Sequence, residues 1–99
     1  MKVNADFQIV PMGVGLSVSK YVAECEKIII AAGLEHRLHA FGTNLSGEWD
    51  AVMACVRRCH DRLHEMGAQR VSTALKIGTR TDREQSLQDK LDSVNTHLE

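Results

Sequence analysis

The chain has 99 residues, of which 43% are hydrophobic and 25% are charged, proportions typical of a globular protein with one domain spanning 1–99. The 12 basic and 13 acidic residues give a formal net charge of −1 and form no basic stripe, so neither nucleic acid nor an anionic membrane is expected as a partner. No apolar run approaches the ~20 residues of a membrane span, and the first residues lack the apolar core of a signal peptide, which favours a cytoplasmic protein without membrane insertion.

The first predicted element is a strand. Residues 3–12 alternate between two faces, and Pro11 predicts that the strand ends near there. After a glycine-containing loop, a helix capped by Ser17 or Ser19 and ended by Gly33 is expected. The apolar residues that share one face of this helix are Val18, Tyr21, Val22, Cys25, Ile29 and Ala32.

A hairpin and a second helix are predicted next. Residues 35–41 have the pattern of a short strand, and 42–44 predict a turn into a partner strand at 44–47. Ser46 or Gly47 is expected to cap the following helix. Its apolar series holds one face for about five turns. That series is Trp49, Val52, Cys55, Val56, Cys59, Leu63 and Met66.

The segment 70–82 predicts a strand that leads into a last helix. Val71, Thr73, Leu75 and Ile77 alternate with smaller or polar residues, and Gly78 begins the exit from the sheet. Thr81 or Asp82 is expected to cap the helix, with Gln85 placed for a capping box. Free backbone N–H groups beside Arg80 would then form a candidate site for an anion or polar ligand.

The order of these elements predicts the fold class. It is α+β, a ferredoxin-like βαββαβ sandwich with an additional C-terminal helix. Helices on one face of an antiparallel sheet leave the other face bare. We expect self-association to cover that face, with the extra helix helping. The residues predicted to lie on it are Asp6, Gln8, Val10, Arg37, His39, Phe41, Ser72, Ala74 and Lys76.

Cysteine and histidine spacing does not predict a metal centre. The three cysteines have no disulfide-framework spacing, which favours free, buried thiols. On one helix, Cys55 and Cys59 lie on the core flank, whereas His60 and His64 lie on the opposite flank. Cys59 and His64 are about 140° apart around the helix, so the four cannot converge on one tetrahedral ion. A two-histidine surface site at His60 and His64 stays open.

No grouping of residues predicts catalysis, and no cofactor motif is present. No nucleophile-activating motif surrounds the histidines or the cysteines. Two polar loops, 42–49 and 78–82, remain as candidate binding elements. Arg80 and Asp82 are interpreted either as a local ion pair or as part of an anion site. Trp49 is interpreted either as a core anchor or as a ligand wall.

The chain resembles the thiamine-binding, MTH1187/YkoF-like family over nearly its whole length. The resemblance rests on two segments that are specific when taken together. These are Gly42-Thr43-x-Leu45-x-Gly47-Glu48-Trp49-Asp50 and Lys76-Ile77-Gly78-Thr79-Arg80-Thr81-Asp82. The resemblance implies a ferredoxin-like fold, dimers that assemble into tetramers, and binding of thiamine or its hydroxymethylpyrimidine part. It implies no catalytic activity.

The residue chemistry suits such a ligand, because an aminopyrimidine needs an apolar wall, an acceptor for its amino group and hydroxyl donors for its ring nitrogens. Arg80 fits a phosphate better than a cation. The candidate ligand-binding residues are Met12, Phe41 and Trp49 as walls, Glu48 and Asp82 as carboxylates, Ser19, Thr43 and Thr79 as hydroxyls, and Arg80. The favoured function is a non-enzymatic binding protein. The alternative is an enzyme or regulatory subunit acting on a small phosphorylated metabolite through the Thr79-Arg80 loop.

Overall fold

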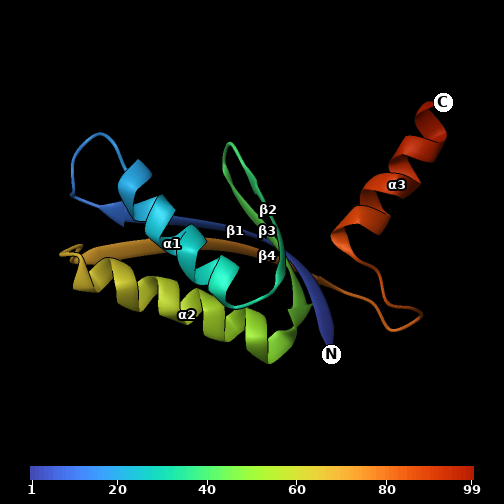
Figure 1. Ribbon diagram of the computed structural model, residues 1–99, viewed down its shortest axis with the longest axis horizontal. Coiled ribbons are helices and arrows are strands. Elements are labelled where there is room, and N and C mark those ends of the chain that lie inside the picture. Colours follow the sequence, from blue (N-terminus) through green and yellow to red (C-terminus); the bar gives the residue numbers. More distant parts are fainter.

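The computed structural model describes residues 1–99 as a four-stranded antiparallel sheet with three helices, which confirms the ferredoxin-like α+β fold with an additional C-terminal helix (Figure 1). No helix combines the length and the apolar character needed to cross a membrane. In chain order the elements are β1 (Lys2–Met12), α1 (Ser19–Ala31), β2 (Glu35–His39), β3 (Gly42–Glu48), α2 (Trp49–Glu65), β4 (Arg70–Thr79) and α3 (Leu87–Leu98).

The strands lie in the order β2-β3-β1-β4, so β1 occupies a central position. Both β3 and β4 run antiparallel to β1, and Val3 pairs with Gly47 on one side and Thr79 on the other. Farther along β1, Phe7 pairs with Thr43 and Leu75. The carboxyl ends of β3 and β4 therefore meet at the amino end of β1.

The core lies between one face of the sheet and helices α1 and α2, which pack side by side across it (Figure 1). Alternate residues of β1 point into this core, as a period of two requires. The buried apolar residues are Val3, Ala5, Phe7 and Ile9 of β1, Tyr21, Cys25 and Ile29 of α1, Leu45 of β3, Val52, Cys55, Val56, Cys59 and Leu63 of α2, and Ala68.

The opposite face of the sheet carries polar side chains that bond to one another across the strands. Asp6 of β1 accepts a hydrogen bond from the Asn44 side chain at 3.1 Å, and its Oδ1 lies 2.7 Å from Nε2 of His39. Ser46 donates to the Asn4 side chain at 2.7 Å. This arrangement explains how a sheet face without a covering helix satisfies its polar groups.

The structure corrects the position of the β2–β3 turn. The turn lies at Ala40-Phe41, and β3 begins at Gly42, where 42–44 had been expected to turn. Phe41 therefore stands at the tip of the hairpin and is 79% exposed, not on the open sheet face. The reason is steric: a Cβ at Gly42 would lie 2.6 Å from the carbonyl oxygen of Phe7, so this glycine permits close strand approach.

The first two helices also start differently from the expectation. The N-cap of α1 is Val18, not either of the nearby serines, and no side chain caps it. The N-cap of α2 is Glu48, the last residue of β3, whereas Ser46 and Gly47 lie inside that strand. The Ser46 hydroxyl is used within the sheet, where it bonds to Asn4, so it is not free to cap a helix.

Helix α3 begins at Leu87, later than a cap at Thr81 or Asp82 had predicted. Its capping box is formed by Ser86 and Asp89, each side chain accepting from the other's backbone N–H at 3.0 Å. Glu35 accepts from the Leu87 N–H at 2.8 Å. The helix has no buried residue and projects away from the sheet (Figure 1).

Candidate functional site

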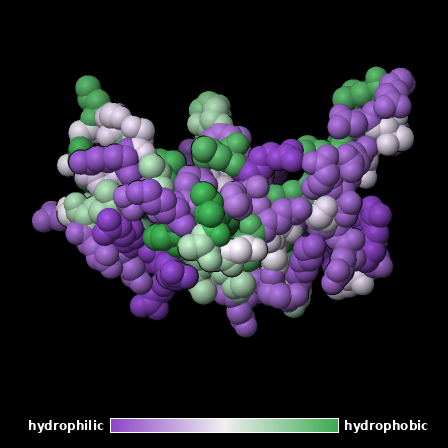
Figure 2. Space-filling view, in the orientation of Figure 1, coloured by the Kyte–Doolittle hydropathy of each residue, from purple (hydrophilic) through white to green (hydrophobic).

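An apolar cavity of about 180 Å³ lies between α1, β1 and the β2–β3 hairpin. The space-filling view shows the molecule hollowed between the loop that precedes α1 and the tip of this hairpin (Figure 2). Ten of the 15 residues that line the cavity are hydrophobic, including Val22, Cys25 and Ile29 on α1, the N-cap residue Val18, and Phe7 and Ile9 on β1. Such walls favour a flat, uncharged ring over a strongly hydrated group.

A carboxylate and a hydroxyl are the polar centre of this cavity. The Thr43 hydroxyl, which is buried, donates a hydrogen bond to the Glu26 carboxylate. The strand register places Thr43 on the helix-covered face opposite Phe7. Glu26 lies one helical turn from Val22, so α1 carries this acidic side chain onto the flank of its buried face.

The Glu26 side chain was not among the residues expected from sequence. The sequence does contain a sign of its role. Glu26 lies beside Cys25 and between Val22 and Ile29, which places its carboxylate at the edge of the apolar face of the helix. The partner across the cavity comes from β3, and helical periodicity carries no information about it. The pair offers an acceptor for an amino group beside a hydroxyl that can donate or accept.

Three of the nine expected residues lie at or beside this cavity. Phe41 and Thr43 line it. Ser19 lines an adjoining shallow groove, which shares Val22 and Glu26 with the cavity. Apolar walls, one carboxylate and two hydroxyls are thus brought to one side of the molecule.

The other expected residues lie elsewhere. Met12 is at the far end of β1, where it pairs with Arg70. Glu48 forms an ion pair with the Met1 amino group at 2.7 Å. Trp49, at the start of α2, is 39% exposed and donates its backbone N–H to the Met1 carbonyl. The expected wall and carboxylate of the 48–49 segment therefore do not line the apolar cavity.

A second cavity of about 540 Å³ includes Thr79 and Arg80 in its lining. Arg80 is held by Asp82, with 2.7 Å between Nε and Oδ1, and by Gln85 at 3.2 Å. Hydrogen bonding to Arg80 lowers the pKa of the Asp82 carboxyl to about 2. The expectation that free helix N–H groups lie beside Arg80 is corrected. Helix α3 begins seven residues after Arg80, and its first N–H groups bond to Glu35 and Ser86.

The histidines and cysteines have separate partners. His60 bonds to the Thr73 hydroxyl, whereas Nδ1 of His64 lies 2.8 Å from the Ala68 carbonyl oxygen. Cys25, Cys55 and Cys59 are free and buried between α1 and α2. Hydrogen bonding to Cys25 and Cys55, together with burial, raises the pKa of the Cys59 thiol far above its ordinary value. No group of three or more potential metal ligands is gathered.

Comparisons with known proteins place these features in a family context. Residues 5–95 match the family model described as thiamine-binding protein. The UPF0045 protein sll0230 of Synechocystis is 50% identical over 99 residues, covering 100% of this chain and 82% of the relative. The UPF0045 protein ECM15 of Eremothecium gossypii is 43% identical over 94 residues, covering 94% of this chain and 90% of the relative.

Solved structures agree in fold. The hypothetical protein MJ1052 of Methanocaldococcus superposes with a TM-score of 0.89 at 33% identity, covering 95% of this chain and 96% of that one. A candidate thiamine biosynthesis/salvage protein of Thermotoga maritima superposes with a TM-score of 0.82 at 18% identity, covering 95% and 99%. From the match over 5–95 and these relatives, the chain belongs to the thiamine-binding protein family, which includes the UPF0045 proteins.

Proposed function

We propose that this chain is a non-enzymatic cytoplasmic protein that binds thiamine through its hydroxymethylpyrimidine part, in the cavity between α1 and the β2–β3 hairpin. The observation that carries the proposal is the Glu26–Thr43 pair within apolar walls. An aminopyrimidine combines a flat apolar face with an amino donor and ring-nitrogen acceptors, which match these walls, the carboxylate and the hydroxyl in turn.

The size of the cavity supports one ring and not the whole ligand. Its volume of about 180 Å³ is below the roughly 300–1,000 Å³ of pockets that enclose drug-sized molecules. The second, positively charged ring of thiamine would then lie outside, in the groove lined by Ser19 and Glu26. A carboxylate at that boundary favours a cation over an anion.

The alternative, an enzyme or regulatory subunit that acts through the Thr79-Arg80 loop, has less support. Arg80 is already engaged by Asp82 and Gln85. The matched family is described by binding and not by a reaction.

Self-association is the second part of the proposal. Leu91, Val94 and Leu98 of α3 are 41%, 58% and 75% exposed, and they recur at the spacing of one helical face. Apolar surface gathers at the end of α3 and at the hairpin tip (Figure 2). We propose that a dimer or tetramer covers α3 and the open sheet face.

The test is calorimetric titration of the full chain with thiamine and with hydroxymethylpyrimidine. Glu26→Gln keeps the shape of the side chain and removes its charge, and we expect it to weaken binding of both compounds by about 1.5–3 kcal/mol. Glu24→Gln is the matched control, because Glu24 lies on the same helix but faces Lys27 and Arg62. Equal affinities for all three proteins would contradict the proposed site.

A further inference from the structure

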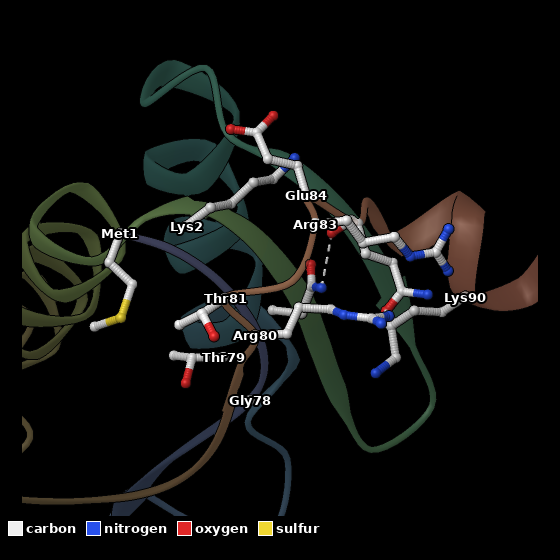
Figure 3. A pocket seen from close by; sticks show the side chains of 11 residues that line it. Met1, Lys2, Gly78, Thr79, Arg80, Thr81, Arg83, Glu84 and Lys90 are labelled. Carbon is white, nitrogen blue, oxygen red and sulfur yellow. Dashed lines mark hydrogen bonds between the residues drawn. The ribbon is translucent and has the colours of Figure 1, made fainter.

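The larger cavity, at the amino end of β1, is strongly cationic and is not used by the proposed pyrimidine site. Its lining includes the side chains of Lys2, Arg80, Arg83 and Lys90, with Glu84 as the only carboxylate. Figure 3 shows Arg80, Arg83 and Lys90 on the side where the 80–86 loop meets α3. Four cations thus surround a volume of about 540 Å³ in a chain whose net charge is −1.

Three of these four cations are outside the ion pairs of the structure. Lys2, Arg83 and Lys90 take part in none of the ion pairs of the structure. Of the acidic residues around the cavity, Glu84 lines it, Asp82 is engaged by Arg80, and Asp89 accepts from the backbone of Ser86 and also interacts electrostatically with Arg83 and Lys2. The side-chain N–H donors of Lys2, Arg83 and Lys90 are therefore available to an anionic ligand.

The neutral groups of the cavity suit an oxyanion as well. The hydroxyls of Thr79 and Thr81 lie in its lining, and only one of its 11 lining residues is hydrophobic. Hydroxyls donate to phosphate oxygens, an arginine fork binds two of them at once, and lysine supplies a point charge. This donor set differs from that of the apolar cavity, which offers a carboxylate.

We infer that Lys2, Arg83 and Lys90 form a binding site for the phosphate or diphosphate group of a small metabolite, with Thr79 and Thr81 as additional donors. The site is wider than a single phosphate requires, so a diphosphate or a phosphate ester fits it better than inorganic phosphate. Arg80 orients the loop through Asp82 and Gln85 and is not itself the main anion ligand.

This site is independent of the pyrimidine cavity within one chain. On β1, Lys2 and Asn4 line the cationic cavity, whereas the lining of the pyrimidine cavity begins at Phe7. Lys2 and Phe7 are separated by about 17 Å along an extended strand, at about 3.4 Å per residue. The apolar cavity is lined by residues of α1, whereas the cationic cavity is lined by Lys90 of α3. These two helices lie at opposite ends of the molecule (Figure 1).

The experiment is a titration of the full chain at low ionic strength with inorganic phosphate, inorganic diphosphate and thiamine phosphate. Binding is measured by calorimetry and by phosphorus NMR. We expect diphosphate to bind more tightly than phosphate and added salt to weaken both. The double variant Arg83→Ala with Lys90→Ala should weaken diphosphate binding about tenfold or more, since two charge-assisted contacts are removed. Both residues are exposed, so the fold should be retained.

The control is Arg57→Ala with Arg58→Ala, which removes the same charge from the exposed face of α2. It should bind diphosphate like the unmodified protein, and so should Glu26→Gln, which separates this inference from the pyrimidine proposal. A third outcome is that thiamine phosphate binds, inorganic diphosphate does not, and the Arg83/Lys90 double variant loses thiamine phosphate binding. That outcome supports the site and identifies thiamine phosphate as the source of the phosphate group. Failure of all three compounds to bind, or equal binding by the two double variants, overturns the inference.

Discussion

Gly42 offers the most direct test of how the hairpin is positioned. A Cβ at this residue would lie 2.6 Å from the Phe7 carbonyl oxygen, 3.3 Å from its carbon and 3.5 Å from Cε1 of His39. The nearest atom belongs to the backbone of the central strand and not to a flexible side chain, so the hairpin itself has to shift. Overpacking of this kind costs roughly 1–3 kcal/mol.

The variant Gly42→Ala should therefore unfold at a lower denaturant concentration than the unmodified protein. For a domain of this size, each 1 kcal/mol corresponds to about 4–8 °C in Tm. Gly42, Phe7 and Thr43 all line the apolar cavity. The same shift should therefore move Thr43 relative to Glu26 and weaken the binding of the pyrimidine compound.

Gly78→Ala is the matched control, because Gly78 is also in a strand and its added Cβ would lie 3.9 Å from the nearest atom, the Asn4 carbonyl oxygen. This contact is ordinary, so we expect a change within about 1 kcal/mol, in the stabilising direction. Chemical denaturation of both variants, followed by circular dichroism, compares them directly. If Gly42→Ala and Gly78→Ala were equally stable, the steric explanation of the hairpin would be wrong.

Two further predictions concern the loop and the last helix. Because Arg80 lowers the pKa of Asp82, the stabilising effect of their pair is present above the ordinary carboxyl pKa of 3.8 and is lost as the pH falls toward about 2. NMR titration of the Asp82 carboxyl should give a pKa of about 2, and the Arg80→Ala variant should return this pKa toward 3.8. An unchanged pKa in the variant would show that Arg80 does not cause the shift. The double variant Leu91→Glu with Val94→Glu should have a lower mass by light scattering than the unmodified protein. The control Ser93→Glu with Thr96→Glu, on the opposite face of α3, should not. Equal masses for the two double variants would show that the face with Leu91 and Val94 is not an interface.

Much of the fold follows from periodicity, and the differences arise where one residue type has two physical uses. Gly42 has the chemistry of a turn residue, but its role is close contact with Phe7, which places the turn two residues earlier. Asp82 has the chemistry of a helix cap, but Arg80 competes for it, and the cap is formed by Ser86. Each outcome depends on a partner that local sequence does not specify.

The candidate site was predictable to a smaller extent, because a cavity is made by elements that meet only in the tertiary structure. Thr43 was expected to contact a ligand, and it lines the apolar cavity. Its partner Glu26 lies 17 residues earlier and belongs to α1. Periodicity places each of these side chains on a face, but only the packing of α1 against the hairpin brings the two faces together.

Strand register explains why the nine expected residues do not form one site within a chain. Strand β3 runs from Gly42 to Glu48 beside β1, so Thr43 and Glu48 are separated by about 17 Å, at about 3.4 Å per residue. Glu48 and Thr79 instead reach the same end of the sheet, on either side of Lys2 and Val3. The second segment that carries the family resemblance thus lines the cationic cavity with its residues 78–81, whereas Gly42 and Thr43 of the first segment line the apolar one. The proposed pyrimidine site and the proposed phosphate site therefore differ in place and in chemistry, and the titrations with uncharged and phosphorylated compounds address them separately.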